Sequence, residues 1–244
     1  MSKYKILHFK SLPSTQDMAK EFTKKYLENI VVVADSQTKA RGRFNRKWHS
    51  KKGGLWFSIL IKTKNIENIQ YITFISALSV VKSIKQIAKL ETKIKWPNDV
   101  HYMGKKLCGI LTESILGNEN LIIIGVGLNL NQSYFANEIK NIATSLKIIK
   151  NKNFSKDLFL KNILTNFADI YENKYKKNKL KFILKSWKRN SDTLGKDVEV
   201  LTKNGVLTGK AVGIDKNCSL IIKLKNRKLF SVIEGDVKIR DYHK

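Results

Sequence analysis

The sequence predicts an α+β protein in which a large domain of strands and helices precedes a small β-barrel. Strand-like and helix-like periods alternate through the first part of the chain, whereas the part after Gly195 holds only short strand-like runs. A chain of 244 residues with 42% hydrophobic content can bury the cores of one large and one small domain. We therefore expect domains at residues 1–190 and 191–244.

The first elements of the large domain alternate between strand and helix. Residues 4–10 predict a strand, and Ser14 or Thr15 is placed to cap the helix that follows. That helix carries apolar residues four positions apart, at Met18, Phe22 and Tyr26. The β-branched run at 30–34 is typical of a buried strand, and the alternation at 55–62 predicts another.

The remainder of the large domain predicts a long helix, a short strand, a hairpin and two further helices. The long helix covers residues 69–89 and the short strand residues 93–96. Residues 106–116 and 121–131 are apolar strands joined by a Gly-Asn-Glu-Asn turn, so they should pair antiparallel. A helical pattern returns over residues 155–190.

The C-terminal part predicts a barrel of five short strands, separated by turn sequences such as Asn-Gly and Glu-Gly-Asp. The strands are expected at residues 197–201, 206–212, 220–224, 228–232 and 237–240.

The net charge of +27 first suggests a nucleic-acid-binding protein. The lysines are scattered along the whole chain and accompanied by many asparagines and isoleucines, which is typical of a compositional bias. We therefore expect only weak affinity for polyanions, together with faster association of an acidic protein partner.

The sequence indicates a cytoplasmic protein with no membrane-spanning segment. The first ten residues contain three lysines and no long apolar core, so they do not form a secretory signal. The apolar stretch at 69–88 is interrupted by Lys82, Lys85 and Gln86. Cys108 and Cys218 lie far apart with no metal-ligand spacing, which favours reduced thiols in the core.

Residues 37–48, which we call the arginine loop, are the most informative segment. Arg41, Arg43 and Arg46 concentrate here, although lysine dominates elsewhere. Their forked donors match phosphate and carboxylate oxygens, which predicts an anionic ligand. Gly42 permits close approach of the backbone, and Trp48 offers a flat surface for a base. The alternative is a solvated basic loop.

Two further polar motifs adjoin the only prolines of the chain. Pro13 precedes Ser14-Thr15-Gln16, whose hydroxyls and amide suit an uncharged polar ligand, although a simple helix cap is equally typical. Pro97 precedes Asn98 and Asp99, which the pattern places in a turn.

Residues 105–111 predict an apolar strand that begins with two lysines. Simple alternation places Lys106 on one face with Cys108, and Gly109 on the other. Lys106 can neutralise a carboxylate and a phosphate, or it can be an edge-strand lysine that guards against aggregation. Residues 125–131 contain a Gly-x-Gly pair that lacks the rest of a dinucleotide fingerprint. The four histidines, at positions 8, 49, 101 and 243, form no metal spacing, so we predict no protein metal site.

Five motifs in this order resemble those of the bacterial biotin protein ligases. They are Ser14-Thr15-Gln16, Gln37 with the arginine loop, residues 95–99, residues 106–111 and residues 125–129. The chain departs from the family pattern at Ala40 and Asn45, where glycine is common. The resemblance covers nearly the whole chain.

The resemblance implies a mixed sheet with helices, related to the catalytic domains of class II aminoacyl-tRNA synthetases, followed by an SH3-like barrel. It also implies that ATP with Mg²⁺ activates biotin to biotinyl-5′-adenylate. Biotin then passes to a specific lysine of a biotin carboxyl carrier domain, by default that of acetyl-CoA carboxylase or a related carboxylase. The family also allows a homodimer.

The same resemblance implies a role for each site residue. Biotin-binding residues are expected at Ser14, Thr15, Gln16, Gln37, Arg41, Gly42, Arg43, Lys106 and Gly109. Binding of ATP and the adenylate is expected at Arg41, Arg43, Arg46, Trp48, Lys106 and Asn129. Catalysis is expected to depend on Arg41, Arg43 and Lys106 for charge stabilisation, and on Asp99 for positioning the acceptor lysine.

Two other functions compete with this interpretation. A lipoate-type acyl protein ligase performs the same adenylation, but its Arg-Arg-x-Ser-Gly-Gly-Gly-Ala signature is absent. A nucleic-acid-binding repressor is the second, because some biotin ligases carry an N-terminal helix-turn-helix domain. Since the first motif begins at Ser14, we expect the short form, which lacks that domain and binds no specific DNA.

Overall fold

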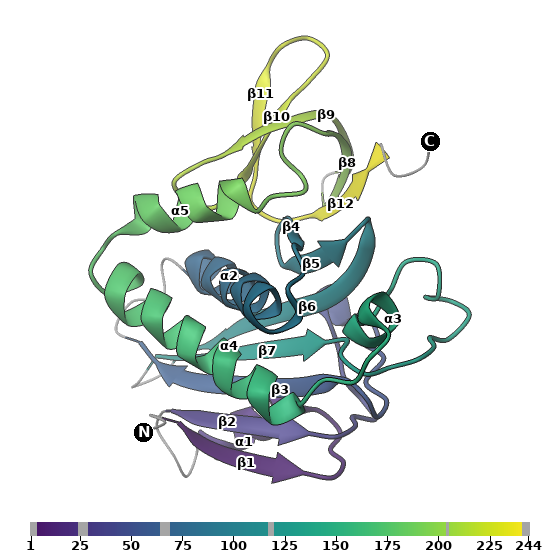
Figure 1. Cartoon of the computed structure of the whole chain (residues 1–244). Helices are drawn as coiled ribbons and strands as arrows, with labels where there is room; N and C mark the ends of the chain where they lie inside the picture. Colours follow the sequence, from purple (N-terminus) through teal and green to yellow (C-terminus); the bar gives the residue numbers. More distant parts are fainter. Residues whose placement is uncertain (1–3, 24–28, 64–68, 117–119, 204, 241–244) are drawn as a thin grey trace.

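The computed structural model describes residues 4–23, 29–63, 69–116, 120–203 and 205–240. Within these residues it contains one seven-stranded and one five-stranded sheet, with the smaller sheet at the C-terminal end of the chain (Figure 1). The large sheet has the strands β1 (Lys5–Phe9), β2 (Ile30–Ala34), β3 (Leu55–Lys62), β4 (Lys93–Lys95), β5 (Asp99–Tyr102), β6 (Lys105–Ile115) and β7 (Leu121–Leu128). The helices are α1 (Thr15–Phe22), α2 (Ile69–Ala88), α3 (Leu146–Lys150), α4 (Lys156–Ile170) and α5 (Leu180–Arg189).

The large sheet is mixed, with the strand order β1-β2-β3-β7-β6-β5-β4. β1 and β2 pair in parallel, and every other neighbouring pair is antiparallel. The predicted hairpin is confirmed as β6 and β7, which pair from Cys108 opposite Leu128 to Ile115 opposite Leu121. Its expected turn lies mostly outside the described residues.

Helices cover both faces of this sheet. On one face α2 packs against β6 and β7, with α4 and α5 behind it, and on the other α1 packs against β2 and β3 (Figure 1). All of β2 is buried: Val31 and Val33 join the core around α2, and Val32 joins the cluster around α1. Two-sided burial explains why β2 is a continuous β-branched run. The apolar face of α1 is confirmed for Met18 and Phe22, whereas Tyr26 lies outside the described residues.

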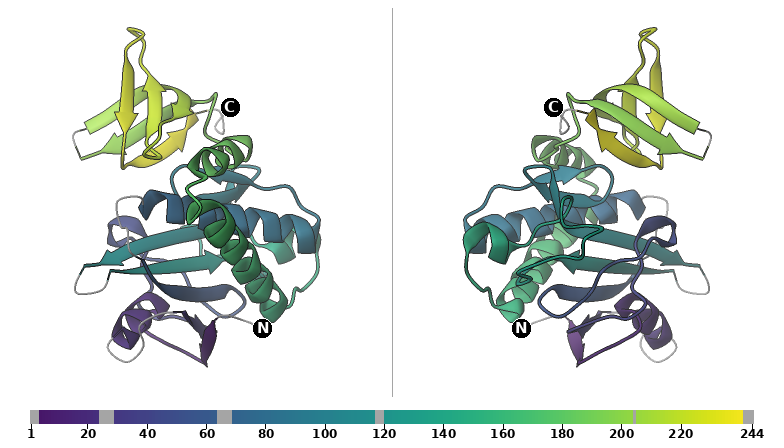
Figure 2. Two further views of the ribbon diagram at one scale, coloured as in Figure 1. Left: turned by 90° about the vertical axis from the view of Figure 1, so that its left-hand side faces the viewer. Right: turned by 90° about the vertical axis from the view of Figure 1, so that its right-hand side faces the viewer.

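The five expected C-terminal strands are confirmed. They are β8 (Asp197–Thr202), β9 (Gly205–Ile214), β10 (Leu220–Lys223), β11 (Leu229–Val232) and β12 (Asp236–Ile239), all antiparallel in the order β11-β10-β9-β8-β12. Trp96 Nε1 donates to the Cys218 carbonyl at 3.0 Å, and the Tyr71 hydroxyl donates to the Lys216 carbonyl at 2.8 Å. These contacts dock the small sheet next to the β4–β5 edge of the large one (Figure 1 and Figure 2). The domain boundary at residue 190 stays a prediction.

The structure adds elements that the sequence patterns did not predict. Asp99 begins strand β5, so the expectation of a turn holds only for the residues before it. The helical pattern at 155–190 is divided by a π-helical turn at Tyr171–Tyr175, and α3 is an additional short helix. Among the described residues, none of the helices has both the length and the apolar character needed to cross a membrane.

Candidate functional site

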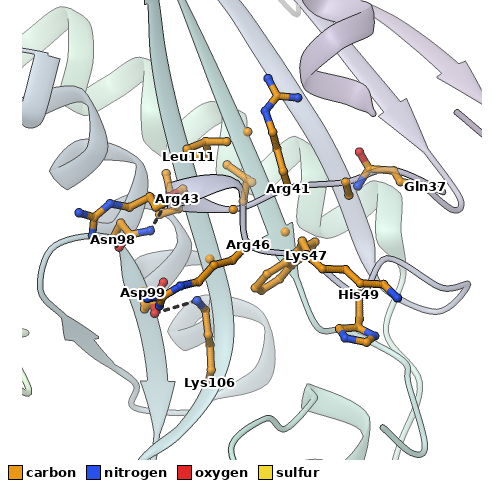
Figure 3. Close-up of a pocket in the computed structure, with 18 of the residues that line it drawn as sticks. Gln37, Arg41, Arg43, Arg46, Lys47, His49, Asn98, Asp99, Lys106 and Leu111 are labelled. Atoms are coloured by element: carbon orange, nitrogen blue, oxygen red, sulfur yellow. Dashed lines mark hydrogen bonds and ion pairs between the residues drawn. The ribbon is translucent and has the colours of Figure 1, made fainter. Parts of the chain in front are cut away.

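A cavity of about 310 Å³ lies between the arginine loop and the large sheet (Figure 3). It is lined by every residue for which the family resemblance implied a binding or catalytic role: Ser14, Thr15, Gln16, Gln37, Arg41, Gly42, Arg43, Arg46, Trp48, Asp99, Lys106, Gly109 and Asn129. They come from α1, the arginine loop, β5, β6 and the end of β7. The fold therefore gathers the predicted positions into one place, and their individual roles remain predictions.

A buried polar network closes the α1 end of the cavity. The Ser14 hydroxyl accepts from the Asp17 amide at 3.2 Å, so Ser14 is the helix cap as well as a lining residue. Thr15 and Ser58 hydroxyls lie 2.9 Å apart, and Ser58 donates to Gln16 Oε1 at 3.1 Å. Gln16 Nε2 donates to Glu113 Oε2 at 3.0 Å. The network fixes which way the Gln16 amide faces.

Gln37 and Asn129 each connect separate segments of the cavity wall through side-chain hydrogen bonds. Gln37 Oε1 accepts from the Thr15 amide at 2.7 Å, and its Nε2 donates to the Ser50 hydroxyl at 3.0 Å. Asn129 is only 4% exposed, and its Oδ1 accepts from Gln132 Nε2 at 3.0 Å. Both amides are therefore held in defined orientations by the protein.

Arg41 is directed toward α1 and away from the centre of the cavity (Figure 3). It pairs with Asp17 at 2.5 Å and with Glu113 at 3.2 Å. Burial lowers the pKa of Arg41, but the two carboxylates outweigh that effect and the net shift is upward. This ion-pair cluster ties the start of the arginine loop to α1 and β6.

The tip of the arginine loop is a short helical turn at Arg43–Asn45. Phe44 and Asn45 both have φ of 56°, in the left-handed region. Asparagine tolerates this conformation, whereas phenylalanine rarely adopts it. The Phe44 ring lies 4.9 Å from the Arg43 guanidinium carbon and 5.8 Å from that of Arg46. Cation–π contacts on the ring therefore help to hold the turn.

Lys106 and Asp99 form an ion pair at the centre of the cavity, with Nζ 2.8 Å from Oδ2. Burial raises the pKa of Asp99, but Lys106, His101 and Lys95 outweigh it and hold the pKa below its ordinary value. Asp99 is thus an anion that offsets part of the positive charge of the site. His101, to which the sequence assigned no role, is buried 4.0 Å from Asp99.

The predicted alternation on β6 is wrong at its start. β5 and β6 shift register between Val100 opposite Cys108 and His101 opposite Lys106, which leaves Leu107 as an extra residue. This bulge turns Lys106 to the face of Gly109, where the Lys106 Cε would lie 3.2 Å from an added Cβ. Leu107 and Cys108 are both fully buried in the core.

Trp48 lies flat against two glycines of the sheet. An added Cβ would approach its ring to 3.0 Å from Gly109 and to 2.5 Å from Gly127. Lys106 Nζ stands 5.0 Å from the centre of the ring, a cation–π distance. The indole therefore occupies the space that side chains at Gly109 and Gly127 would fill.

Several lining residues belong to none of the motifs that the sequence shows. Ser58 is hidden in an alternating strand, and Asp236 lies in the expected barrel. Phe135, Ile139 and Ile142 form an apolar wall near Asn129, from a segment with no regular periodicity. The only available signal was their apolar character in an otherwise polar stretch.

Comparisons with known proteins identify the family to which these motifs belong. Residues 8–129 match the Biotin/lipoate A/B protein ligase family, and residues 193–240 match the Biotin protein ligase C terminal domain. The chain is 34% identical over 241 residues to the Bifunctional ligase/repressor BirA of Bacillus subtilis, covering 96% of this chain and 74% of that protein. It is 31% identical over 126 residues to the Biotin--[acetyl-CoA-carboxylase] ligase of Mycobacterium tuberculosis, which covers 49% of this chain and 46% of that protein.

The structure of the biotin protein ligase from Aquifex aeolicus in complex with biotin and ATP superposes with a TM-score of 0.87. The sequence identity is 32%, with 96% of this chain and 98% of that chain covered. The similarity therefore extends over the sheet that forms the cavity and over the C-terminal barrel alike. Its two matched segments and its similarity to these relatives show that the chain belongs to the biotin protein ligase family.

Proposed function

We propose that this protein activates biotin with ATP to biotinyl-5′-adenylate and transfers biotin to a lysine of a carboxyl carrier domain. The observation that carries the proposal is the order of chemistry along a single cavity. Ser14, Thr15 and Gln16 line the α1 end, beside an Arg41 that is paired with two carboxylates. Cations with at most one carboxylate partner among the described residues line the centre, and Trp48 with an apolar wall lines the far end. That order matches a ligand with a polar neutral head, an anionic middle and a flat base.

The central cations suit an attack of the biotin carboxylate on the α-phosphorus of ATP. The carboxylate is already ionised, so the step needs no general base. It does need two anions held in line against their repulsion. Lys106 and Arg43, with Arg46 at the edge of the cavity, are the cations that would stabilise the added negative charge. Arg41, paired with Asp17 and Glu113, would hold the loop in place.

The donor set also fits the Mg²⁺ that accompanies ATP. Asp99 Oδ1 is buried without a hydrogen-bond partner among the described residues, and Mg²⁺ prefers one or two carboxylate oxygens together with phosphates and water. When bound, the ion would neutralise charge on the leaving pyrophosphate. Asp99 and Asp236 are the carboxylates that line the described part of the cavity.

The second half-reaction requires a lysine from the carrier domain to reach the mixed anhydride before water does. The arginine loop would provide the shield, and Asp99, as an anion, would orient the incoming amine. The carrier domain of acetyl-CoA carboxylase or a related carboxylase is the proposed acceptor. A homodimer, the absence of specific DNA binding and a cytoplasmic location remain predictions.

The direct test is incubation of the protein with biotin, MgATP and a biotin carrier domain, followed by mass spectrometry of the carrier. We expect one biotinyl group on the carrier and none on a carrier whose acceptor lysine is changed to arginine. Parallel reactions contain lipoate in place of biotin. An unmodified carrier in the biotin reaction, with lipoylation in the parallel one, would reassign the protein to the lipoate branch of the family.

A further inference from the structure

A turn of the C-terminal barrel contacts the arginine loop. Asp236, the first residue of β12, forms an ion pair with Arg46. Arg43 Nη1 donates to the Gly235 carbonyl at 3.2 Å, and Arg43 Nη2 lies 3.9 Å from a Glu234 carboxylate oxygen. We call residues 234–236 the barrel turn. Two of the three arginines of the loop are thus held by a segment about 190 residues away in sequence.

The barrel turn is a firm support because it is packed against β8. An added Cβ on Gly235 would lie 2.6 Å from Val200 Cγ1 and 2.9 Å from the Leu201 carbonyl oxygen. Only glycine lets the turn lie this close to β8 while its carbonyl faces Arg43. Asp236 pairs with Leu201 in the β8–β12 register, which fixes its backbone. The acceptors for the loop are therefore built into the barrel sheet.

The electrostatics of the site favour this contact. The Arg43 side chain is only 18% exposed, and burial lowers its pKa, while Asp236, Glu234 and Asp99 act in the opposite direction. A buried guanidinium needs such partners to remain charged at low cost. Arg46 is more exposed, at 62%, but Asp236 is 30% exposed and itself lines the cavity. The barrel thus contributes a charged group to the site.

We propose that Asp236 is a positioning residue of the nucleotide half of the site: through Arg46, and with the Gly235 carbonyl on Arg43, it docks the arginine loop over the cavity. The inference rests on the proposed function for its kinetic consequence. An arginine loop held by the barrel shields the adenylate and presents its cations to the phosphates in advance. A loop released from the barrel does both less well.

The chain offers a matched control for removing Asp236. Glu199 and Arg240 form another ion pair in the same barrel, at 2.5 Å, and neither lines the cavity. Asp236→Asn and Glu199→Gln each replace one barrel carboxylate by the amide of the same shape. Only the first change touches the arginine loop.

The structural readout is hydrogen exchange of peptides from the arginine loop, measured on the protein without substrates. The Gly42 amide donates to the Arg46 carbonyl at 2.7 Å and the Trp48 amide to the Ala40 carbonyl at 3.0 Å, so loop opening exposes both amides. Asp236→Asn should speed the exchange of both amides by about three- to fivefold. This is the effect expected when the opening of the loop no longer has to break one strong, solvent-exposed ion pair. Glu199→Gln should leave it unchanged.

The kinetic readout is the KM for ATP and the lifetime of the enzyme-bound adenylate. Asp236→Asn should raise the KM for ATP and shorten the lifetime of the adenylate, each by about three- to fivefold as for the exchange rates. The KM for biotin should stay unchanged. If Asp236 acts through Arg46, Asp236→Asn combined with Arg46→Gln should equal Arg46→Gln alone. Gly235→Ala should reproduce the faster exchange, because its Cβ displaces the barrel turn.

The outcomes separate this inference from the proposed function. Equal exchange rates and equal adenylate lifetimes in Asp236→Asn and Glu199→Gln would overturn the docking role. Additive effects of Asp236→Asn and Arg46→Gln would also overturn it, because Asp236 would then act independently of the loop. A wild-type protein that forms no adenylate would refute the proposed function, and the exchange experiment would still decide the docking.

Discussion

Glu113 is the side chain that joins the two polar motifs at the α1 end of the cavity. It accepts from Gln16 Nε2 at 3.0 Å and from Arg41 Nη2 at 3.2 Å. Gln16 and Arg41 belong to different motifs, and each is proposed to act on the biotin side of the site. One carboxylate on β6 therefore sets the positions of both.

Glu113→Ala should raise the KM for biotin by about three- to tenfold, with little change in the KM for ATP. The variant loses a charge-assisted hydrogen bond to Arg41 and one to Gln16, which at this exposure are together worth about 1 kcal/mol. Steady-state adenylation at varied biotin and at varied ATP measures the two constants.

The control for Glu113 is Asp17→Asn, which also removes an ion pair of Arg41 but leaves the Gln16 contact intact. We expect a smaller rise in the biotin KM for this variant. Equal effects in Glu113→Ala and Asp17→Asn would mean that Arg41 alone accounts for the change, and that the orientation of Gln16 by Glu113 does not matter.

At this scale the sequence predicted the residues that carry a motif and missed those defined by long-range contact. Arginines and lysines suited to phosphate stand out by type and by spacing, and the cavity gathers them as expected. Glu113 and Arg41 are 72 positions apart, and Gly235 and Arg43 are 192 apart. No local pattern marks such partners, because their role depends on the folded sheet and barrel.

At the scale of elements, strand β7 divides the cavity through two glycines on one face. An added Cβ at Gly125 would lie 2.6 Å from Gln16 Oε1, whereas one at Gly127 would lie 2.5 Å from Trp48 Nε1. Both contacts are closer than side chains tolerate without movement. The same strand therefore supports the α1 end of the cavity at one position and the Trp48 end at the next.

Gly125→Ala and Gly127→Ala should consequently separate the two substrates. Gly125→Ala displaces the Gln16 amide and should raise the KM for biotin by about tenfold or more, the loss expected for misplaced buried hydrogen bonds. Gly127→Ala displaces Trp48 and should mainly raise the KM for ATP. The two variants are matched, since each adds one methyl group to the same face of β7. If both variants raised the same KM, Trp48 and Gln16 would not serve different substrates.

Strand β6 shows why element prediction stops short of the site. The sequence predicted the strand and its hairpin, which the structure confirms. A period of two cannot reveal the extra residue at Leu107, because two adjacent apolar residues, Leu107 and Cys108, are compatible with a strand whether or not it contains a bulge. That single residue decides whether Lys106 shares a face with Gly109, and thus whether its charge enters the cavity.

At the scale of the whole molecule, the barrel and the large sheet meet where the site is most charged. Trp96 and Tyr71 dock the barrel through hydrogen bonds, and the barrel turn reaches the arginine loop. The strand that follows Trp96 in the chain, β5, carries Asp99 and His101. The net charge of +27 for the whole chain is therefore a weaker indication of function than the few charged side chains that line the cavity.

His101 makes the stability of the whole protein depend on pH. It is 5% exposed, and burial lowers its pKa from 6.5 to about 4; Asp99 opposes this shift, while Lys95 and Lys106 add to it. Between these values the unfolded chain binds a proton that the folded protein does not. The free energy of unfolding should therefore fall as the pH is lowered from about 6.5 to 4, by up to about 3 kcal/mol.

Urea denaturation of the wild type and of His101→Gln across this pH window measures the effect. We expect the wild type to lose stability toward acid and the variant to lose distinctly less, because glutamine takes up no proton in either state. Titration of the His101 imidazole by NMR supplies an independent value. A midpoint near 6.5 in the folded protein, or the same slope in both proteins, would show that the imidazole is solvated and that other groups set the acid sensitivity. A midpoint near 4 would instead place a neutral imidazole beside the Asp99–Lys106 pair throughout the physiological range, so that the charge at the centre of the cavity stays constant as the pH changes.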